Sequence, residues 1–302
     1  QLHGVVRGAL KPTIAAIDAA VLSTLAGCGD VNRNVMCTPV ANSARLLEQL
    51  EATARRLSRA LSPRTAAYRE LWLDGKPAAT AEAEPTPVPE ALRSKSPEEP
   101  LYGDTYLPRK FKIGIALPPS NDVDVYTQDL GLIAITEGER LLGFNVLVGG
   151  GMGRSHGDAT TYPLLAQSLG FVTEPRLLTT AMAVLTAQRD LGDRTDRRHS
   201  RLKYTVERVG VAAFRAEVER RQGYAFAPER PFTFTSTSDR FGWFHAADTE
   251  HLLVPLPSGR VRDTEASALR TALRELALVH RGTLRLTPNQ NLLFSNVHTE
   301  TR

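Results

Sequence analysis

Residues 106–117 read Tyr-Leu-Pro-Arg-Lys-Phe-Lys-Ile-Gly-Ile-Ala-Leu, and this stretch decides the fold that we expect. Its second half alternates in the way that is typical of a β-strand. Two more strand signals follow closely, at 130–135 and 144–148, and a run of glycines at 149–151 ends the last of them. The sequence therefore predicts a sheet in the middle of the chain.

Helices are expected on both sides of this sheet along the sequence. The clearest spans residues 43–62, where apolar residues share one face at helical spacing. These residues are Leu46, Leu47, Leu50, Ala54, Leu57 and Leu61. Another helix is predicted at 13–27, and the region from about 162 to 222 has a helical pattern. The proline-rich stretch 77–100 is predicted to be a flexible or extended surface excursion outside the core.

The two ends of the chain carry further strand patterns. Residues 1–6 read as a strand, and residues 226–302 read as strand, strand, helix and strand. Short strands are expected within 245–254, 283–287 and 291–294. Asp263 or Thr264 is expected to cap the helix between them. The prediction is an α+β fold, with a mixed sheet in a helix-rich central domain and a smaller sheet-and-helix module after it.

Composition excludes several classes of protein. The chain has 302 residues, is 42% hydrophobic and 23% charged, and carries a net charge of +4. This balance is that of a globular protein rather than a fibrous or disordered one, and no apolar run reaches the length of about 18 residues that a membrane span needs. The positive charge is too small for a dedicated nucleic-acid binder. Cys28 and Cys37 are too few for a disulfide framework, so we expect reduced thiols and a cytoplasmic location.

Two segments place cations where an anion could bind. Arg33 lies between Asn32 and Asn34, and its rigid fork of donors suits a planar oxyanion, although an ordinary turn stabilised by Asn and Asp is the alternative. Lys110 and Lys112 are two residues apart, so on a strand they share one face. Adjacent ammonium groups repel unless an anion or water separates them. Both an anion pocket and a solvated strand face therefore remain open.

Two later segments are also suited to a bulky or anionic ligand. Three glycines follow a strand, namely Gly149, Gly150 and Gly151. They would let backbone N–H groups approach a ligand closely, although a plain loop is an equal alternative and the dinucleotide-binding fingerprint is not matched. Arg194, Arg197 and Arg201 are spaced as on one face of a helix. Such a face could hold several carboxylates or could simply be solvated.

Taken in order, these segments resemble the siroheme-dependent sulfite and nitrite reductase family. The matching stretches are GDVNRNVMC (29–37), YLPRKFK (106–112), GFNVLVGGGMGR (143–154), DRTDR (193–197), KYTVER (203–208) and TPNQNL (287–292). The resemblance implies that 1–12 end a first ferredoxin-like half-domain and that 226–302 form a second one. Residues 13–222 would form the siroheme-binding domain, with 77–100 as a surface linker.

The resemblance also implies an activity and its site. The family reduces sulfite to hydrogen sulfide, or nitrite to ammonia, by six electrons at a siroheme coupled to a 4Fe–4S cluster through a shared cysteine thiolate. Arg33, Lys110 and Lys112 match the substrate-binding positions and would hold the oxyanion and support proton delivery. Cofactor contacts are implied for Gln1, His3, Asn121, Gly149, Gly150, Gly151, Arg194, Arg197, Arg201, Lys203 and Gln290.

Sulfite is the expected substrate, because the family's sulfite reductases carry Lys-x-Lys where its nitrite reductases usually carry Lys-x-Asn. The electron donor would be ferredoxin or an NADPH-flavoprotein subunit, with no role for nucleic acid or membrane. The family's cluster cysteines, C-x5-C and C-x3-C, are expected beyond Arg302, so we expect a fragment that holds no metal ligands and is inactive alone. A siroheme nitrite reductase and a non-catalytic, truncated paralogue that binds an anion or tetrapyrrole remain alternatives.

Overall fold

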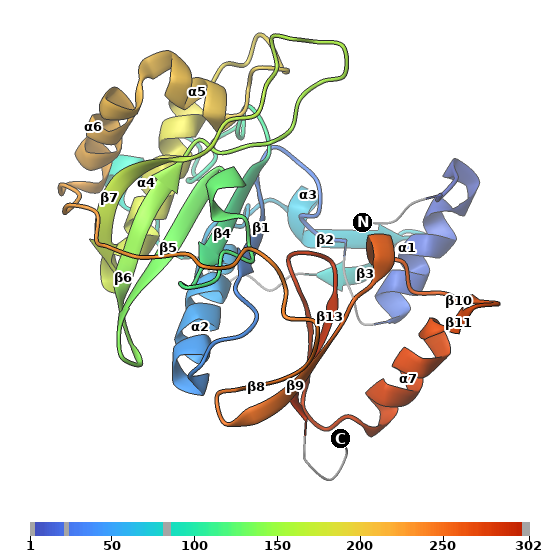
Figure 1. Cartoon of the computed structure of the whole chain (residues 1–302). Coiled ribbons are helices and arrows are strands. Elements are labelled where there is room, and N and C mark those ends of the chain that lie inside the picture. Colours follow the sequence, from blue (N-terminus) through green and yellow to red (C-terminus); the bar gives the residue numbers. More distant parts are fainter. Residues whose placement is uncertain (1–3, 21–23, 81–85, 298–302) are drawn as a thin grey trace.

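The central domain is built on a five-stranded mixed sheet (Figure 1). The computed structural model describes all of the chain except residues 1–3, 21–23, 81–85 and 298–302. In spatial order the strands are β1 (Asn32–Cys37), β4 (Phe111–Ala116), β5 (Leu130–Glu137), β6 (Arg140–Val148) and β7 (Gln167–Thr173). The first three run parallel, and the pairs β5–β6 and β6–β7 are antiparallel. The expected α+β class and the three strands predicted in this region are confirmed.

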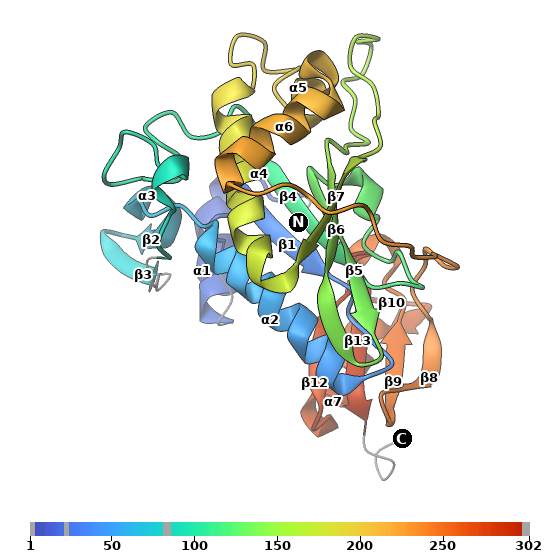
Figure 2. The same cartoon turned by 90° about the vertical axis from the view of Figure 1, so that its left-hand side faces the viewer.

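Helices cover one face of this sheet (Figure 2). They are α2 (Ala44–Ala60), α4 (Leu177–Leu191), α5 (Leu202–Val209) and α6 (Val211–Gln222). The predicted helix at 43–62 is confirmed: the Ser43 hydroxyl caps it by accepting from the Leu46 amide at 3.3 Å, and Leu50 and Leu57 are fully buried. The side chains of α2 and α4 pack with the strands into one large apolar core, so the strands form a rigid base for the loops at their ends.

The other face of the sheet is covered by an extended segment. Phe232 and Phe234 from this segment pack on a smaller apolar cluster that includes Ile133 and Leu147. Asn145, on β6, exchanges two hydrogen bonds with the main chain of Arg230, at 2.7 and 3.0 Å. The segment leads from the central domain to the second module.

The C-terminal module has its own four-stranded antiparallel sheet, in the order β12-β13-β9-β8. Its elements are β8 (Gly242–Ala246), β9 (Thr249–Val254), β10 (Asp263–Thr264), β11 (Ser267–Ala268), α7 (Leu269–Val279), β12 (Thr283–Leu286) and β13 (Leu292–Val297). The strands predicted within 245–254, 283–287 and 291–294 and the helix between them are confirmed, but the order is longer than strand, strand, helix and strand, because the β10–β11 pair precedes α7 and two strands follow it. The predicted cap is wrong, because α7 begins after Ala268; Asp263 instead accepts from the Thr271 amide at 3.0 Å from outside the helix.

The structure corrects four other predictions. Residues 4–6 are not a strand, and they lead into a 3-10 turn; residues 1–3 lie outside the described part. The first helix, α1, spans Leu10–Ala19 rather than 13–27. The region 162–222 contains strand β7, which pairs with β6 through buried small and apolar residues. The stretch 77–100 is not all surface, because Val88 and Leu92 are buried in the main core.

A short helix and a hairpin follow α2, and the second strand of the hairpin runs into the proline-rich stretch. They are α3 (Ala66–Arg69), β2 (Glu70–Leu73) and β3 (Lys76–Thr80). Tyr68 of α3 packs on Tyr106 with ring centroids 5.4 Å apart. This contact holds the short helix against the segment that leads into β4.

Candidate functional site

A basic hollow of about 430 Å³ lies beside the end of the sheet where β4 and β5 begin and β6 ends. Its lining residues are Arg109, Lys110, Gly153, Arg154, Ser155, Thr161, Arg197, Arg198, Arg201, Lys203 and Tyr204. Among the described residues, no Asp or Glu lines it. So many cations around one cavity repel each other, and an anionic ligand would relieve that repulsion.

The three predicted substrate residues come together beside this hollow. β1 and β4 pair in parallel, and a register shift places one extra residue, Arg33, between the pairs Asn32–Phe111 and Asn34–Lys112. Burial lowers the pKa of Lys110, and the positive charges of Lys112, Arg201, Arg33 and Arg109 lower it further. These cations therefore act on one another through space, which favours the anion-pocket interpretation over an ordinary turn and a solvated strand face.

The substrate residues differ in how they are held. The Arg33 guanidinium donates to the Gly29 carbonyl at 3.0 Å and lies 3.7 Å from the Cys28 sulfur. In the part of the chain that the structure describes, the ammonium groups of Lys110 and Lys112 have no hydrogen-bond or ion-pair partner. Arg33 is thus oriented by its own turn, whereas both lysines are available to a ligand.

Arg201 is fixed by a buried carboxylate. Asp129, the residue before β5, is fully buried, and its two oxygens accept from the Arg201 guanidinium at 2.8–3.1 Å. The same carboxylate accepts from the main-chain amide of Lys112 at 3.0 Å. The sequence interpretation missed Asp129, because a single acid before a strand carries no motif of its own.

The glycine loop and Lys203 form one packed unit. The Lys203 ammonium donates to the carbonyls of Gly151 (3.1 Å), Gly153 (2.9 Å) and Tyr162 and is 2% exposed. A Cβ on Gly150 would lie 2.3 Å from the Tyr126 carbonyl oxygen. A Cβ on Gly149, whose φ is +84°, would lie 3.2 Å from Val206. Internal packing thus accounts for the glycines, and their contact with a ligand stays a prediction.

The expected helical face of arginines is wrong. The segment 192–201 is irregular, and α5 begins only at Leu202. Arg197 still reaches the basic hollow, but Arg194 turns away and donates to the carbonyls of Thr105 and Tyr106 at 3.2 and 2.7 Å. Short Asp-anchored turns, in which Asp193 accepts from the Thr195 amide at 2.7 Å, replace the helix.

The remaining predicted cofactor residues lie elsewhere. Asn121 is buried and accepts from the Val125 amide at 2.8 Å. Gln290 occupies the turn between β12 and β13 with φ of +68°. Neither lines the basic hollow, and Gln1 and His3 lie outside the described residues. Three arginines that the sequence interpretation did not select do line it: Arg109, Arg154 and Arg198. All three lie in segments that it had singled out.

The residues present fit one of the two expected cofactors. Siroheme has many peripheral carboxylates, and within the described chain Arg109 and Arg154 line the hollow without a hydrogen-bond or ion-pair partner. A 4Fe–4S cluster does not fit these residues. No group of three or more His, Cys, Asp or Glu among the described residues could hold a metal ion, and Cys28 and Cys37 are both free.

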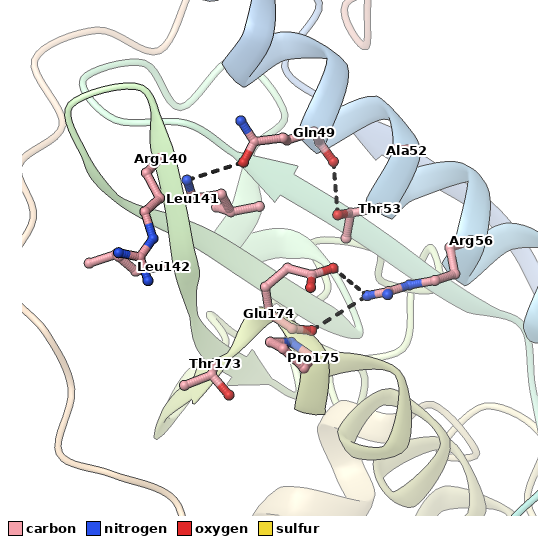
Figure 3. A pocket seen from close by; sticks show the side chains of 10 residues that line it. All are labelled: Gln49, Ala52, Thr53, Arg56, Arg140, Leu141, Leu142, Thr173, Glu174 and Pro175. Carbon is pink, nitrogen blue, oxygen red and sulfur yellow. Dashed lines mark hydrogen bonds and ion pairs between the residues drawn. The ribbon is translucent and has the colours of Figure 1, made fainter.

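A second cavity, of about 670 Å³, lies at the opposite end of β6 (Figure 3). Arg56 of α2 pairs there with Glu174 at 2.6 Å. Gln49 accepts from the Leu141 amide at 3.3 Å and joins the helix to the β5–β6 hairpin. Arg56 is neutralised by its partner, which leaves Arg140 as the one other charged residue of the described lining, far fewer cations than the basic hollow gathers.

Comparisons with known proteins agree with these features. Residues 52–226 match the family model described as nitrite and sulphite reductase 4Fe-4S domain, and residues 246–302 match the model of the nitrite/sulfite reductase ferredoxin-like half domain. The solved structure of the Mycobacterium tuberculosis NirA protein has a TM-score of 0.64 and 21% identity, covering 97% of this chain and 45% of that one. That likeness shows the fold alone.

Curated relatives are more similar in sequence. The chain is 48% identical over 301 residues to the sulfite reductase (NADPH) hemoprotein beta-component of Geobacillus kaustophilus, covering 99% of this chain and 51% of the relative. It is 50% identical over 303 residues to that of Myxococcus xanthus, covering 100% and 51%. The chain thus spans about half the length of the curated relatives it matches. The resemblance noted in the sequence is confirmed, and because the first family model matches more than half of the chain, the chain belongs to the nitrite and sulphite reductase family.

Proposed function

We propose that this chain carries the substrate site and siroheme-binding site of an assimilatory sulfite reductase, which reduces sulfite to hydrogen sulfide by six electrons. The observation that carries the proposal is the pair Lys110 and Lys112, two unpaired cations beside Arg33 at the edge of the basic hollow. Sulfite carries more negative charge than nitrite, so a second lysine favours sulfite.

Each of the three residues has a distinct part in the proposal. Arg33 presents a planar fork that suits an oxyanion, and Lys112 supplies a second positive charge to it. Lys110 is the best placed to supply protons as S–O bonds break. Its pKa is lowered by burial and by neighbouring positive charges, so its ammonium gives up a proton more readily than a solvated lysine does.

Siroheme, when bound, would supply the iron at which the oxyanion is reduced. The proposal assigns its carboxylates to cations of the basic hollow, foremost Arg109, Arg154 and Arg201. Asn121, Gln290, Gln1 and His3 stay candidate contacts by resemblance. The cluster's ligands are not among the described residues, and no role in electron transfer is assigned to any of these residues.

The electron donor and the location belong to the same proposal. The curated relatives are named as components of an NADPH-dependent enzyme, which favours an NADPH-flavoprotein subunit over ferredoxin. No helix among the described residues has the length and apolar character needed to cross a membrane. We place the enzyme in the cytoplasm.

The test uses the polypeptide that the complete gene encodes, produced in cells that make siroheme. Sulfide formation is measured with sulfite and reduced methyl viologen, and ammonia formation with nitrite. We expect siroheme in the purified protein, stoichiometric sulfide and a higher kcat/KM for sulfite. A siroheme protein that produces ammonia faster than sulfide would be a nitrite reductase. One that binds sulfite and makes no sulfide would be a non-catalytic paralogue.

A further inference from the structure

We propose that Asp129 is a positioning residue that couples the two sides of the basic hollow, holding the main chain of Lys112 on the substrate side and the guanidinium of Arg201 on the cofactor side. The inference rests on the proposed function and adds a residue that neither motif nor resemblance singled out.

The contacts of the Asp129 carboxylate use both of its oxygens. Oδ1 accepts from Arg201 Nε at 3.1 Å and from Nη2 at 2.9 Å. Oδ2 accepts from Arg201 Nη2 at 2.8 Å and from the Lys112 amide at 3.0 Å. One side chain therefore joins β4 to the residue that precedes α5, although these segments lie far apart in the sequence.

The place of Asp129 in the sheet explains its link to Lys112. The first paired residues of β4 and β5 are Ile113 and Leu130. Lys112 and Asp129 are the residues immediately before them. The Lys112 amide thus donates to the Asp129 side chain at a point where the two strands do not yet pair through their main chains. Because the main chain of Lys112 is fixed there, its side chain starts from a defined point beside the basic hollow.

The main chain of Asp129 reaches the glycine loop as well. Its carbonyl accepts from the Gly149 amide at 3.0 Å, and Arg201 Nη2 lies 3.4 Å from the Gly150 carbonyl oxygen. Three parts of the site therefore meet at one residue: the lysine strand, the glycine loop and the start of α5.

Stability alone is a poor reason for this arrangement. Asp129 is the most buried acidic side chain of the described residues, and removing a carboxylate from water offsets much of what an ion pair contributes. The other arginine pairs at the hollow, Arg197 with Asp30 and Arg198 with Asp158, involve arginines that are more than 60% exposed. Of these three pairs, only Asp129 with Arg201 is shielded from water, so only this pair holds its side chains in a fixed geometry.

The substitution Asp129→Asn tests the proposal at nearly constant shape. The new amide presents N–H groups where Arg201 also presents donors, so the two-point contact is lost. The matched control is Glu174→Gln, which removes a carboxylate from the Arg56 pair in the cavity of Figure 3, at the other end of β6. Both variants are made in the polypeptide that the complete gene encodes.

Three readouts separate positioning from mere structural support. They are the siroheme content, the dissociation constant of sulfite per bound siroheme, and the hydrogen-exchange rate of the Lys112 amide in the siroheme-free protein. For Asp129→Asn we expect less siroheme, sulfite binding weaker by about tenfold to a hundredfold, as misplaced site groups typically give, and faster amide exchange. For Glu174→Gln we expect all three to match the unmodified protein.

The proposal is overturned if Asp129→Asn lowers the melting temperature but keeps the siroheme content and sulfite affinity unchanged. If this variant does not fold, Asp129→Glu decides, because it keeps the negative charge but moves the carboxylate by one methylene group away from its partners. Reduced siroheme content with faster Lys112 amide exchange supports the proposal, and unchanged siroheme content overturns it. The proposed function fails by a different result, namely that the unmodified protein makes no sulfide. In that case the exchange rate of the Lys112 amide still tests the Asp129 contacts.

Discussion

Arg197 and Asp30 form a two-point ion pair, with N–O distances of 2.8 and 3.0 Å, although 167 residues separate them in the sequence. Asp30 lies in the turn that precedes Arg33, and Arg197 lies in the irregular segment before α5. The pair therefore fastens one edge of the basic hollow to the turn that orients a predicted substrate residue. Arg197 is 62% exposed, so solvent screens the pair and its contribution to stability should be small.

The first prediction concerns this pair. Asp30→Asn should lower the free energy of unfolding by less than about 1 kcal/mol, because exposed ion pairs contribute little. The loss should shrink further in high salt, which screens the remaining attraction. Urea denaturation at low and high ionic strength measures both effects. A loss that is large and independent of salt would contradict this view of the pair.

The second prediction concerns substrate choice. Lys112→Asn should reduce kcat/KM for sulfite by about tenfold or more, since a charged hydrogen-bond donor is lost, and should reduce kcat/KM for nitrite less. Lys112→Arg, which keeps the charge, is the control and should retain the preference for sulfite. Steady-state rates with both substrates decide the matter, and equal losses with both would refute the charge argument.

The third prediction concerns the glycine loop. Gly150→Ala should destabilise the protein by about 1–3 kcal/mol, as overpacking typically does, because its Cβ would lie 2.3 Å from the Tyr126 carbonyl oxygen. Gly153→Ala is the matched control, since a Cβ there meets nothing within 4 Å. Thermal unfolding of the two variants should differ clearly. Equal melting temperatures would show that the loop yields more easily than its packing indicates.

The fourth prediction concerns pH and Asp122. Burial raises the pKa of Asp122 to about 6 from 3.8, against the opposing hydrogen bond from Thr38, and the nearby charges of Asp239 and Asp124 raise it further. The folded state thus binds this proton more tightly than the unfolded state. Its contribution to the free energy of unfolding is present at low pH and is lost as pH rises from about 4 through 6, by up to about 3 kcal/mol.

The measurement compares urea denaturation of the unmodified protein with that of Asp122→Asn between pH 5 and 8. The variant lacks the titrating group, so the difference in stability between the two should grow in the variant's favour as pH rises. The control is Asp104→Asn, a change at an exposed position whose charge is not among those that shift Asp122, which should leave the pH dependence as it is. A pH-independent difference for Asp122→Asn would contradict the assignment.

The fifth prediction concerns the two thiols. Burial, together with the Asp122 charge, raises the pKa of Cys37 to about 12 from 9.0, so its thiolate fraction at pH 8 should be about a thousandfold below that of an ordinary cysteine. Cys28 is exposed. Iodoacetamide should modify Cys28 first, which peptide mass spectrometry would show, and equal rates at both sites would refute the prediction.

Sequence patterns predicted the regular parts of this fold well. The helix at 43–62 is amphipathic and has a serine cap, and the strands at 111–117 and 144–148 are dense in apolar residues, so local signals and tertiary packing agree there. Strand β7 was missed because a glycine and a serine interrupt its apolar pattern, and pairing with β6 decides its form. The buried Val88 and Leu92 were missed because prolines around them indicate a surface loop.

The candidate site was predictable where chemistry follows from residue type in a motif. Lys110, Lys112 and Arg33 are brought together as expected, since Arg33 lies in β1 and the two lysines lie just before and within the neighbouring parallel strand β4. The roles of Arg194 and Lys203 could not be predicted, because carbonyl groups from distant segments accept their hydrogen bonds. Asp129 was beyond reach for the same reason: its importance comes from the partners that the fold supplies.

The extra residue in β1 has a consequence for how such a site can diverge. Arg33 lies outside the regular pairing with β4. Its side chain therefore need not follow the alternation of side chains along the strand, which places Val35 against the core. A residue at this position can be exchanged without shifting the register of the strand behind it. The bulge thus separates the residue proposed to hold the oxyanion from the part of β1 whose pairing and packing keep the strand in the sheet.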